Sequence, residues 1–77
     1  MKALADSTRL GILRRIEKGE VCACELPAMV KTSQPAVSQH LAVLREAGLV
    51  EVRKEGVKRL YSASARGRRI LGQISRW

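Results

Sequence analysis

Two prolines set the strongest limit on how this chain can fold. Proline has no amide hydrogen and its ring clashes with the carbonyl group four residues earlier, so within a helix it stands only in the first turn. If Cys24 is the N-cap, Pro27 falls at the third position of a short helix over about residues 25–30. Pro35 falls in the first turn of a longer helix that Ser33 can cap. The prolines therefore predict two helices in succession, joined by residues 31–33.

The longer helix is predicted to have one apolar and one polar face. Val37, Leu41 and Leu44 follow the spacing i, i+4, i+7, and the pattern stops before Gly48. A helix face that merely meets water usually carries Lys and Glu, and this polar face carries short hydrogen-bonding side chains and a small residue in their place. An ordinary solvated surface remains an alternative for this helix alone. Glutamine can pair with adenine through two hydrogen bonds, and a small side chain leaves room for a thymine methyl group. The polar face carries Gln34, Ser38, Gln39 and Ala42.

The flanking segments complete the order of a winged helix-turn-helix. Upstream, Asp6 can cap a helix whose apolar residues recur at helical spacing and which Gly19 ends. Downstream, Val50 and Val52 alternate with charged residues, Glu55–Gly56 is a typical two-residue hairpin loop, and a second strand returns over residues 57–62. This order predicts an α+β, mostly α fold. The hairpin, or wing, carries cations that would reach phosphates or the minor groove: Arg53, Lys54, Lys58 and Arg59.

Composition points to a polyanionic partner and excludes several classes of protein. The 77 residues hold 15 Lys and Arg against 7 Asp and Glu, a formal net charge of +8, which favours nucleic acid. No apolar run is long enough to span a membrane and no signal peptide opens the sequence, so we expect a cytoplasmic protein with no membrane partner. No catalytic constellation or phosphate-binding glycine loop indicates an enzyme. We expect one domain over residues 1–77, with the helix-turn-helix at 25–47, the wing at 49–62 and a C-terminal helix at 64–77.

A family resemblance is carried by four stretches: ALADSTRLGILRRI, EVCACEL, SQPAVSQHLAVLREAGLV and EGVKRLY. They resemble successive blocks of the ArsR/SmtB family of winged-helix repressors, over about residues 3–62. The resemblance implies a homodimer that leaves operator DNA when a metal or another inducer binds. It also implies that the longer helix is the recognition helix and the hairpin the wing. Together, the residues and the resemblance predict these DNA-binding residues: Ser33, Gln34, Ser38, Gln39, His40, Arg53, Lys54, Lys58 and Arg59.

His40 is the only histidine of the chain and admits three interpretations. It can be a structural side chain, a contact to a base or phosphate, or a nitrogen ligand of a metal. Its place between Gln39 and Leu41 on the recognition helix favours the first two.

A final helix is predicted to supply the dimer surface. Its apolar residues form one stripe, which a domain this small would leave partly bare, and the first helix can pack beside it. The alternative is that the stripe completes the core of its own subunit, and Gly67 and Gly72 lower the helix propensity of the segment. The predicted dimerisation residues are Leu4, Ile70, Leu71, Ile74 and Trp77.

Cys22 and Cys24 are the only cysteines, and both lie at or before the predicted start of the short helix. Members of the resembled family that sense thiophilic metals or arsenite carry Cys-x-Cys here, often followed three residues later by another cysteine. In this chain that third place is Pro27, and residues 64–77 contain no Asp, Glu or His for the family's other kind of metal site. The chain therefore lacks the three or four protein ligands that a closed site for a soft ion generally uses.

Three interpretations of the thiol pair stay open. A thiophilic metal ion can bind Cys22 and Cys24 with Glu25, water or a group from a second subunit. Alternatively the pair is a redox switch with a reversible disulfide and no cofactor, because thiols at a helix N-terminus have lowered pKa values and react as thiolates. A disulfide between residues two apart closes a strained ring, so a link between subunits is equally open. The third interpretation is that both are small apolar side chains in the packing.

The predicted function is a sequence-specific regulator of transcription. It would bind double-stranded operator DNA as a homodimeric repressor, released by a thiophilic metal or by thiol oxidation. One alternative is a small basic RNA- or ribosome-associated module, although only Tyr61 and Trp77 are available to stack on bases. Another is a MarR-like repressor that responds to an organic ligand, although a chain this short leaves little volume for a pocket.

Overall fold

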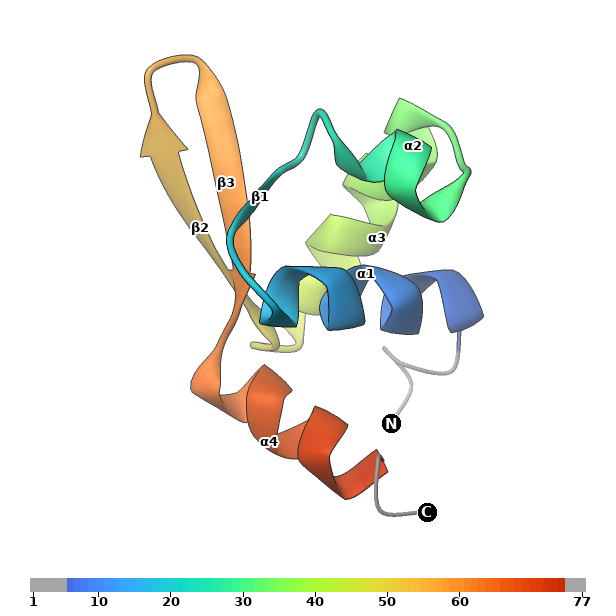
Figure 1. The fold of residues 1–77 in the computed structure, drawn as a ribbon, viewed down its shortest axis with the longest axis vertical. Helices are drawn as coiled ribbons and strands as arrows, with labels where there is room; N and C mark the ends of the chain where they lie inside the picture. The colour runs from blue at the N-terminus through green and yellow to red at the C-terminus, as the bar shows by residue number, and fades with distance from the viewer. Residues whose placement is uncertain (1–5, 75–77) are drawn as a thin grey trace.

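Within residues 6–74, which the computed structural model describes, the chain forms four helices and a three-stranded antiparallel sheet (Figure 1). This is the predicted α+β, mostly α, winged helix-turn-helix order, with one strand that the sequence did not indicate. The wing projects at one end of the molecule and the last helix lies at the other (Figure 1). The elements are α1 (Ser7–Glu17), β1 (Val21–Cys22), α2 (Leu26–Val30), α3 (Gln34–Glu46), β2 (Val50–Glu55), β3 (Lys58–Ala63) and α4 (Ala65–Ile74).

α1 begins at the predicted cap. The Asp6 carboxylate accepts hydrogen bonds from the backbone N–H groups of Thr8, at 2.8 Å, and Arg9, at 3.2 Å. The N–H groups of Arg9 and Thr8 hold the pKa of Asp6 below its usual value of 3.8. The helix ends at the C-cap Lys18, and its buried face consists of Ile12, Leu13 and Ile16.

α2 begins one residue later than predicted. Its N-cap is Glu25, not Cys24, and Pro27 is its second residue, not its third. Cys24 is not the cap because the chain makes a strand and a turn here, closed by a 2.9 Å hydrogen bond from the Glu25 N–H to the Cys22 carbonyl. The helix ends at Lys31, whose backbone is left-handed with φ 54° and ψ 50°. A residue with a Cβ adopts this conformation at a cost of about 1–2 kcal/mol.

α3 has the predicted cap and apolar stripe. The Ser33 hydroxyl oxygen accepts a hydrogen bond from the Ala36 N–H at 3.3 Å. Gly48 follows the helix with φ 74°, a conformation that glycine adopts without strain. The buried residues of the helix are Val37, Leu41 and Leu44.

The sheet has the strand order β1-β3-β2, so the wing has a third strand at its root. β1 is only 2 residues long, with Val21 opposite Tyr61 and Cys22 opposite Leu60. The Ala23 N–H extends the pairing with a 3.0 Å hydrogen bond to the Arg59 carbonyl. The two cysteines therefore lie beside the wing.

The hairpin of the wing turns one residue later than predicted. Glu55 pairs with Lys58, so the loop is Gly56–Val57 and the returning strand starts after Val57. Gly56 has φ 62° at the first loop position, where a type II′ turn requires glycine. The positive φ explains why the turn is centred after Glu55.

α4 packs closely against the chain that leads into the wing. The Ser64 hydroxyl donates to the Gly48 carbonyl at 2.7 Å and accepts from the Gly67 N–H at 3.0 Å. A Cβ at Gly67 would lie 2.2 Å from the Leu49 carbonyl oxygen, whereas a Cβ at Gly72 would meet nothing within 4 Å. Gly67 thus weakens the helix locally but permits this approach.

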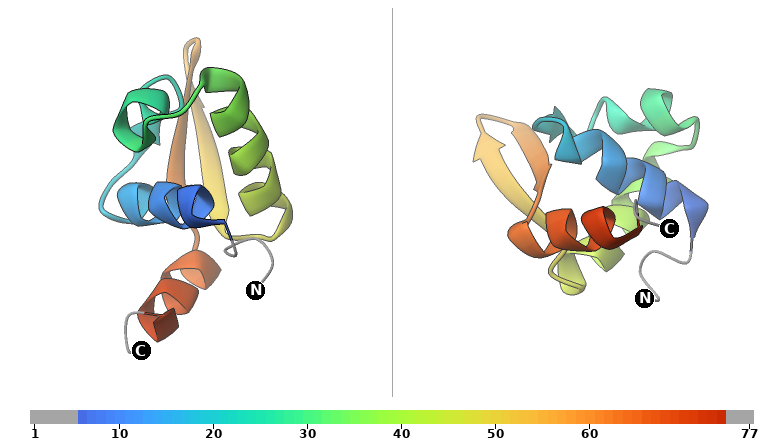
Figure 2. Two further views of the ribbon diagram at one scale, coloured as in Figure 1. Left: turned by 90° about the vertical axis from the view of Figure 1, so that its right-hand side faces the viewer. Right: turned by 60° about the horizontal axis from the view of Figure 1, so that its bottom comes forward.

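One apolar core joins the helices to the sheet. The core consists of Ile12, Leu13, Ile16, Leu26, Val37, Leu41, Leu44, Leu49, Val50, Tyr61, Ala63 and Leu71. Figure 2 shows α4 at one end of the molecule, with α2, α3 and the wing tip toward the other.

No helix within residues 6–74 is long and apolar enough to cross a membrane.

Candidate nucleic-acid interface

α3 turns its polar face away from the core. The apolar stripe is buried on one side of the helix, and the side chains on the other side are exposed. The predicted recognition face is therefore accessible to a partner. Its exposed residues are Gln34, Ser38, Gln39 and Ala42.

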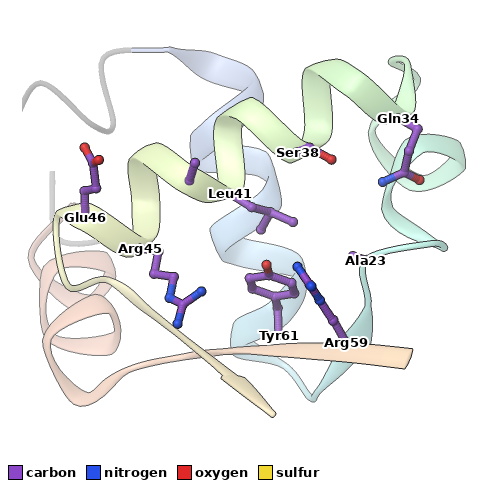
Figure 3. Close-up of a pocket in the computed structure, with 9 residues that line it drawn as sticks. Ala23, Gln34, Ser38, Leu41, Arg45, Glu46, Arg59 and Tyr61 are labelled. Atoms are coloured by element: carbon purple, nitrogen blue, oxygen red, sulfur yellow. The ribbon is translucent and has the colours of Figure 1, made fainter. Parts of the chain in front are cut away.

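A groove of about 590 Å³ runs between α3 and the wing (Figure 3). Arg59 extends from β3 toward α3 beside the Tyr61 hydroxyl group, and Arg45 extends from α3 toward the strands (Figure 3). Gln34 and Ser38 lie along the same side of the groove as Arg45. Guanidinium groups from two walls therefore face one concave surface, an arrangement suited to an anionic strand.

Arg45 and Tyr61 were not among the predicted site residues. Arg45 lies seven residues after Ser38, two helical turns along the same face, so extending the polar face would have found it. Tyr61 reaches the groove through the strand register, opposite Val52, which the sequence does not give. The Tyr61 side chain is only 8% exposed, so it belongs to the core and presents its hydroxyl end to the groove.

His40 lies on α3 but is bonded to α1. Its Nδ1 accepts a hydrogen bond of 3.1 Å from the Arg9 Nε, and its side chain is half-buried. This geometry supports the structural interpretation of His40. We leave it out of the face that contacts bases.

Arg53 is exposed but forms ion pairs with two carboxylates of the protein. Its Nη2 lies 2.7 Å from a Glu20 carboxylate oxygen and 3.1 Å from a Glu55 oxygen, and its Nε donates to Glu20 at 3.1 Å. Hydrogen bonding between the two side chains lowers the pKa of Glu20 and raises that of Arg53. Arg53 therefore ties the wing to the chain before β1. The other predicted wing cations are exposed and form no ion pair with any described residue: Lys54, Lys58 and Arg59.

The two thiols lie in different surroundings. Cys22 is buried on β1, 8% exposed, and Cys24 is exposed in the turn that follows. The Cys24 N–H donates to the Cys22 Sγ at 3.4 Å. Hydrogen bonding from the thiol and then the N–H of Cys24 lowers the pKa of Cys22, and the same thiol pair raises the pKa of Cys24. The predicted lowering of the pKa holds for Cys22 and not for Cys24, and its cause is the Cys24 thiol and N–H, not a helix N-terminus, because both cysteines lie before the N-cap Glu25 of α2.

The described residues do not form a closed metal site. Among residues 6–74, no group of three or more His, Cys, Asp or Glu side chains is placed to hold a metal ion. Cys22 and Cys24 supply two sulfur atoms, fewer than a closed site for a soft ion generally uses.

Only part of the predicted dimerisation stripe is available to a partner. Leu71 is 3% exposed and belongs to the core of its own subunit, because α4 lies over Leu49. Ile70 and Ile74 are half-buried. Leu4 and Trp77 lie outside the described residues.

Comparisons with known proteins agree with this architecture. The sequence profile described as "Bacterial regulatory protein, arsR family" matches residues 6–52. The arsenical resistance operon repressor of Escherichia coli (strain K12) is 54% identical over 56 residues, covering 71% of this chain and 48% of that protein. NolR from Sinorhizobium fredii has a TM-score of 0.89 and 38% identity, covering 97% of this chain and 76% of that one.

A further solved structure is the homodimeric winged helix-turn-helix DNA-binding domain Mb0332 from Mycobacterium bovis. Its TM-score is 0.89 and its identity 29%, covering 96% of this chain and 69% of that one. These neighbours confirm the predicted winged helix-turn-helix fold. The chain spans about half the length of the Escherichia coli repressor.

Proposed function

The chain belongs to the arsR family of bacterial regulatory proteins, a family of regulators and not of enzymes, and on that premise we propose that it represses transcription as a homodimer bound to operator DNA. The observation that carries the proposal is the exposed polar face of α3, with a cationic wing beside it. Glutamine and serine side chains there can hydrogen-bond to base edges in the major groove. A solvated helix face usually carries Lys and Glu, whereas this face carries short side chains that can hydrogen-bond to bases, next to a cationic wing.

The groove between α3 and the wing gives the docking a definite geometry. If α3 lies in the major groove and the wing tip reaches the neighbouring minor groove, the sugar-phosphate strand that separates the two grooves passes between them. Arg45 and Arg59 face that path from opposite sides, and the Tyr61 hydroxyl lies beside Arg59 (Figure 3). We infer that these three residues bind phosphates while Gln34 and Ser38 contact bases.

Dimerisation would place two recognition helices on one operator. A similar solved domain is described as homodimeric, and Ile70 and Ile74 leave apolar surface on α4 of this chain. Two half-sites about 34–36 Å apart, one turn of DNA, then match an imperfect palindrome. Leu71 has no part in the contact because it is already buried.

The proposed inducer site is the thiol pair. A change at this site would be passed to the DNA through the wing. Cys22 is paired with Leu60 of the wing, and Glu20, two residues before it, holds Arg53 of the wing. A change in the position of β1 would therefore move the inner end of the wing, to which β1 is directly bonded. A coupling of about 1–3 kcal/mol would change operator affinity roughly 5–150-fold.

Two inducer chemistries fit the thiols. A thiophilic ion would take two thiolates from this chain and need a further ligand from water or another group. Alternatively a two-electron oxidant would convert two thiols to one disulfide with the release of two protons, either within the pair or between subunits. Cys24 is the exposed thiol of the pair and Cys22 is buried, so an oxidant or a metal ion would reach the Cys24 sulfur first.

The alternative of an RNA-binding module has less support. RNA and single-strand binders stack bases on exposed aromatic rings. Tyr61 is buried in the core apart from its hydroxyl end. The exposed face of α3 carries no aromatic residue.

The DNA proposal is tested by selection from a random duplex library with the wild-type protein, followed by affinity measurements. Ser38→Ala or Gln34→Ala should relax base preference by about 1–3 kcal/mol at one position of each half-site, because a base contact is lost. Arg14→Gln, which removes an exposed cation on α1, is the control and should keep the preference. An unchanged preference in both α3 variants would refute the docking of α3.

The inducer proposal is tested on the same selected duplex. Operator affinity is measured for the wild type, Cys22→Ser and Cys24→Ser under reductant, under oxidant, and with soft metal ions. We expect release of the wild type in at least one condition and loss of that response in both variants. Equal affinity of the wild type in every condition would leave the thiols as packing residues.

A further inference from the structure

The turn between α2 and α3 contains a residue that its backbone disfavours. Lys31 is the one non-glycine residue with positive φ among residues 6–74, at φ 54° and ψ 50°. Glycine adopts this left-handed conformation freely and asparagine tolerates it, whereas a long side chain with a Cβ does so at a cost. Glycine is also the usual residue where a helix ends in this way.

The Lys31 side chain makes no interaction that would stabilise the fold within the described residues. It is exposed and takes part in no hydrogen bond or ion pair with any described residue. The bonds of the turn come from the backbone, where the N–H groups of Lys31 and Thr32 both donate to the Pro27 carbonyl. A glycine would make the same two bonds without the strain. The ammonium group is therefore available to something outside the subunit.

We propose that Lys31 binds a phosphate of the operator duplex, and that the strained turn is the cost of placing its cation there. The inference rests on the proposed function and adds a contact to it. In a helix-turn-helix the first helix crosses the DNA backbone while the second enters the major groove, so the turn between them lies near phosphates. Lys31 stands three residues before Gln34, at the end of α3 where the proposed base contacts begin.

The assignment makes Lys31 different from an ordinary surface lysine in a measurable way. Replacing a surface lysine leaves stability nearly unchanged, and replacing a structural lysine lowers it. Replacing Lys31 should raise stability and weaken DNA binding together. These opposite signs separate a role in the partner complex from a role in the fold.

The experiment compares four variants of the full chain with the wild type. Lys31→Gly removes both strain and charge, Lys31→Asn removes the charge in a residue that tolerates the conformation, and Lys31→Arg keeps both. Lys18→Gln removes an exposed cation from the end of α1, where the backbone is right-handed. Stability is followed by urea denaturation, and affinity is measured against salt on the duplex selected with the wild type and on a scrambled duplex.

Lys31→Gly and Lys31→Asn should shift the urea midpoint upward and weaken binding to both duplexes several-fold. The slope of log affinity against log salt should become shallower by about 0.9, the value for one lost phosphate contact. Lys31→Arg should match the wild type in affinity and slope, and Lys18→Gln should change neither.

Three results would overturn the assignment. A lower urea midpoint in Lys31→Gly would mean that the side chain stabilises the end of α2. Affinity and salt slope in Lys31→Asn equal to those of Lys18→Gln would mean that no phosphate is bound, while the proposed function still stands. A wild-type protein that binds no duplex would refute the proposed function and this contact together.

Discussion

The two ends of the molecule differ in how far their side chains interact with the rest of the protein. We define the base as α1, α4 and residues 47–49, and the groove face as the exposed residues of α3 together with the wing. At the base, the Arg68 Nη1 donates to the Glu17 carbonyl at 3.0 Å, and Gly67 packs against Leu49. On the groove face, Ser38 and Arg59 take part in none of the side-chain hydrogen bonds found within residues 6–74.

This difference separates residues that the fold uses from residues that it leaves free. A polar side chain that is exposed and unbonded contributes little to stability, so its chemistry is open to a partner. Substitutions at the base should therefore change the free energy of unfolding and keep DNA preference. Substitutions on the groove face should keep the free energy of unfolding and change DNA preference or affinity. A residue of either region that changes both would break the comparison, whereas Lys31, in the turn before α3, lies in neither region.

The largest change in the free energy of unfolding is expected at the base, from the substitution Leu71→Ala. Its side chain is 3% exposed within one subunit, so truncation should lower the free energy of unfolding by about 2–5 kcal/mol. Urea denaturation at two protein concentrations measures the loss, which should persist at both. Ile70→Ala, half-buried on the same helix, is the control and should depend more on concentration. If the Leu71 loss vanished at high concentration, that residue would belong to the dimer surface.

The substitution Gly67→Ala tests how closely α4 packs at the base. The added methyl group would overlap the Leu49 carbonyl oxygen, so the helix must shift and stability should fall by about 1–3 kcal/mol. Gly72→Ala, in the same helix with open space around it, should instead stabilise by about 0.5–1 kcal/mol. Thermal unfolding of the two variants gives the test, and equal effects would mean that α4 does not pack as described.

On the groove face, Arg59→Gln should leave stability within about 0.5 kcal/mol of the wild type. It should weaken binding to every duplex and make the salt slope shallower by about 0.9, since one phosphate contact is lost. Arg53→Gln is the matched variant, because that guanidinium is already paired with Glu20 and should contribute less to the slope. Titrations of labelled duplex at several salt concentrations compare the two. A larger slope change in Arg53→Gln would reverse their roles.

The smallest expected effect is a loss of stability at acidic pH. Asp6 and Glu20 have pKa values below 3.8 and 4.5, the values of the free side chains, through backbone N–H groups and Arg53 respectively. A lowered carboxyl pKa stabilises the fold fully above the unfolded value, and that contribution is lost as the pH falls through the folded value. The urea midpoint should therefore decline below about pH 4.5.

Asp6→Asn serves to assign this decline. Asparagine caps a helix as well as aspartate does but does not titrate in this range, so the variant should keep its midpoint at neutral pH and lose part of the decline. Glu20→Gln should lower the midpoint at neutral pH as well, because it breaks the pair with Arg53. An acid profile of Asp6→Asn identical to that of the wild type would mean that its carboxylate does not stabilise α1.

The features that could be predicted from the sequence are those fixed by near neighbours. The Asp6 and Ser33 caps each act within three residues, and the stripe of α3 repeats along one helix. Such patterns show in the sequence because the interaction and the spacing are both local. The exposed face of α3 was predicted for the same reason, as the side opposite the stripe.

Features that depend on distant parts of the chain were missed or displaced. β1 is too short for a pattern and exists because residues about 40 positions later pair with it. The structural role of Arg53 needs Glu20, 33 residues away. Whether Leu71 serves the core or a partner depends on how α4 crosses the chain at Leu49. None of these follows from spacing along one element.

Only the inner part of the hairpin is flanked by strands on both sides of β3. Val21 and Cys22 stand opposite Tyr61 and Leu60, and the Ala23 N–H reaches the Arg59 carbonyl, whereas the outermost pair, Glu55–Lys58, has no third strand beside it among the described residues. A two-stranded ribbon twists more readily than a sheet. The tip of the wing is thus fixed on one side only, next to the cysteines, and in the proposed complex it is the part of the wing with the most freedom to adjust to the shape of the DNA.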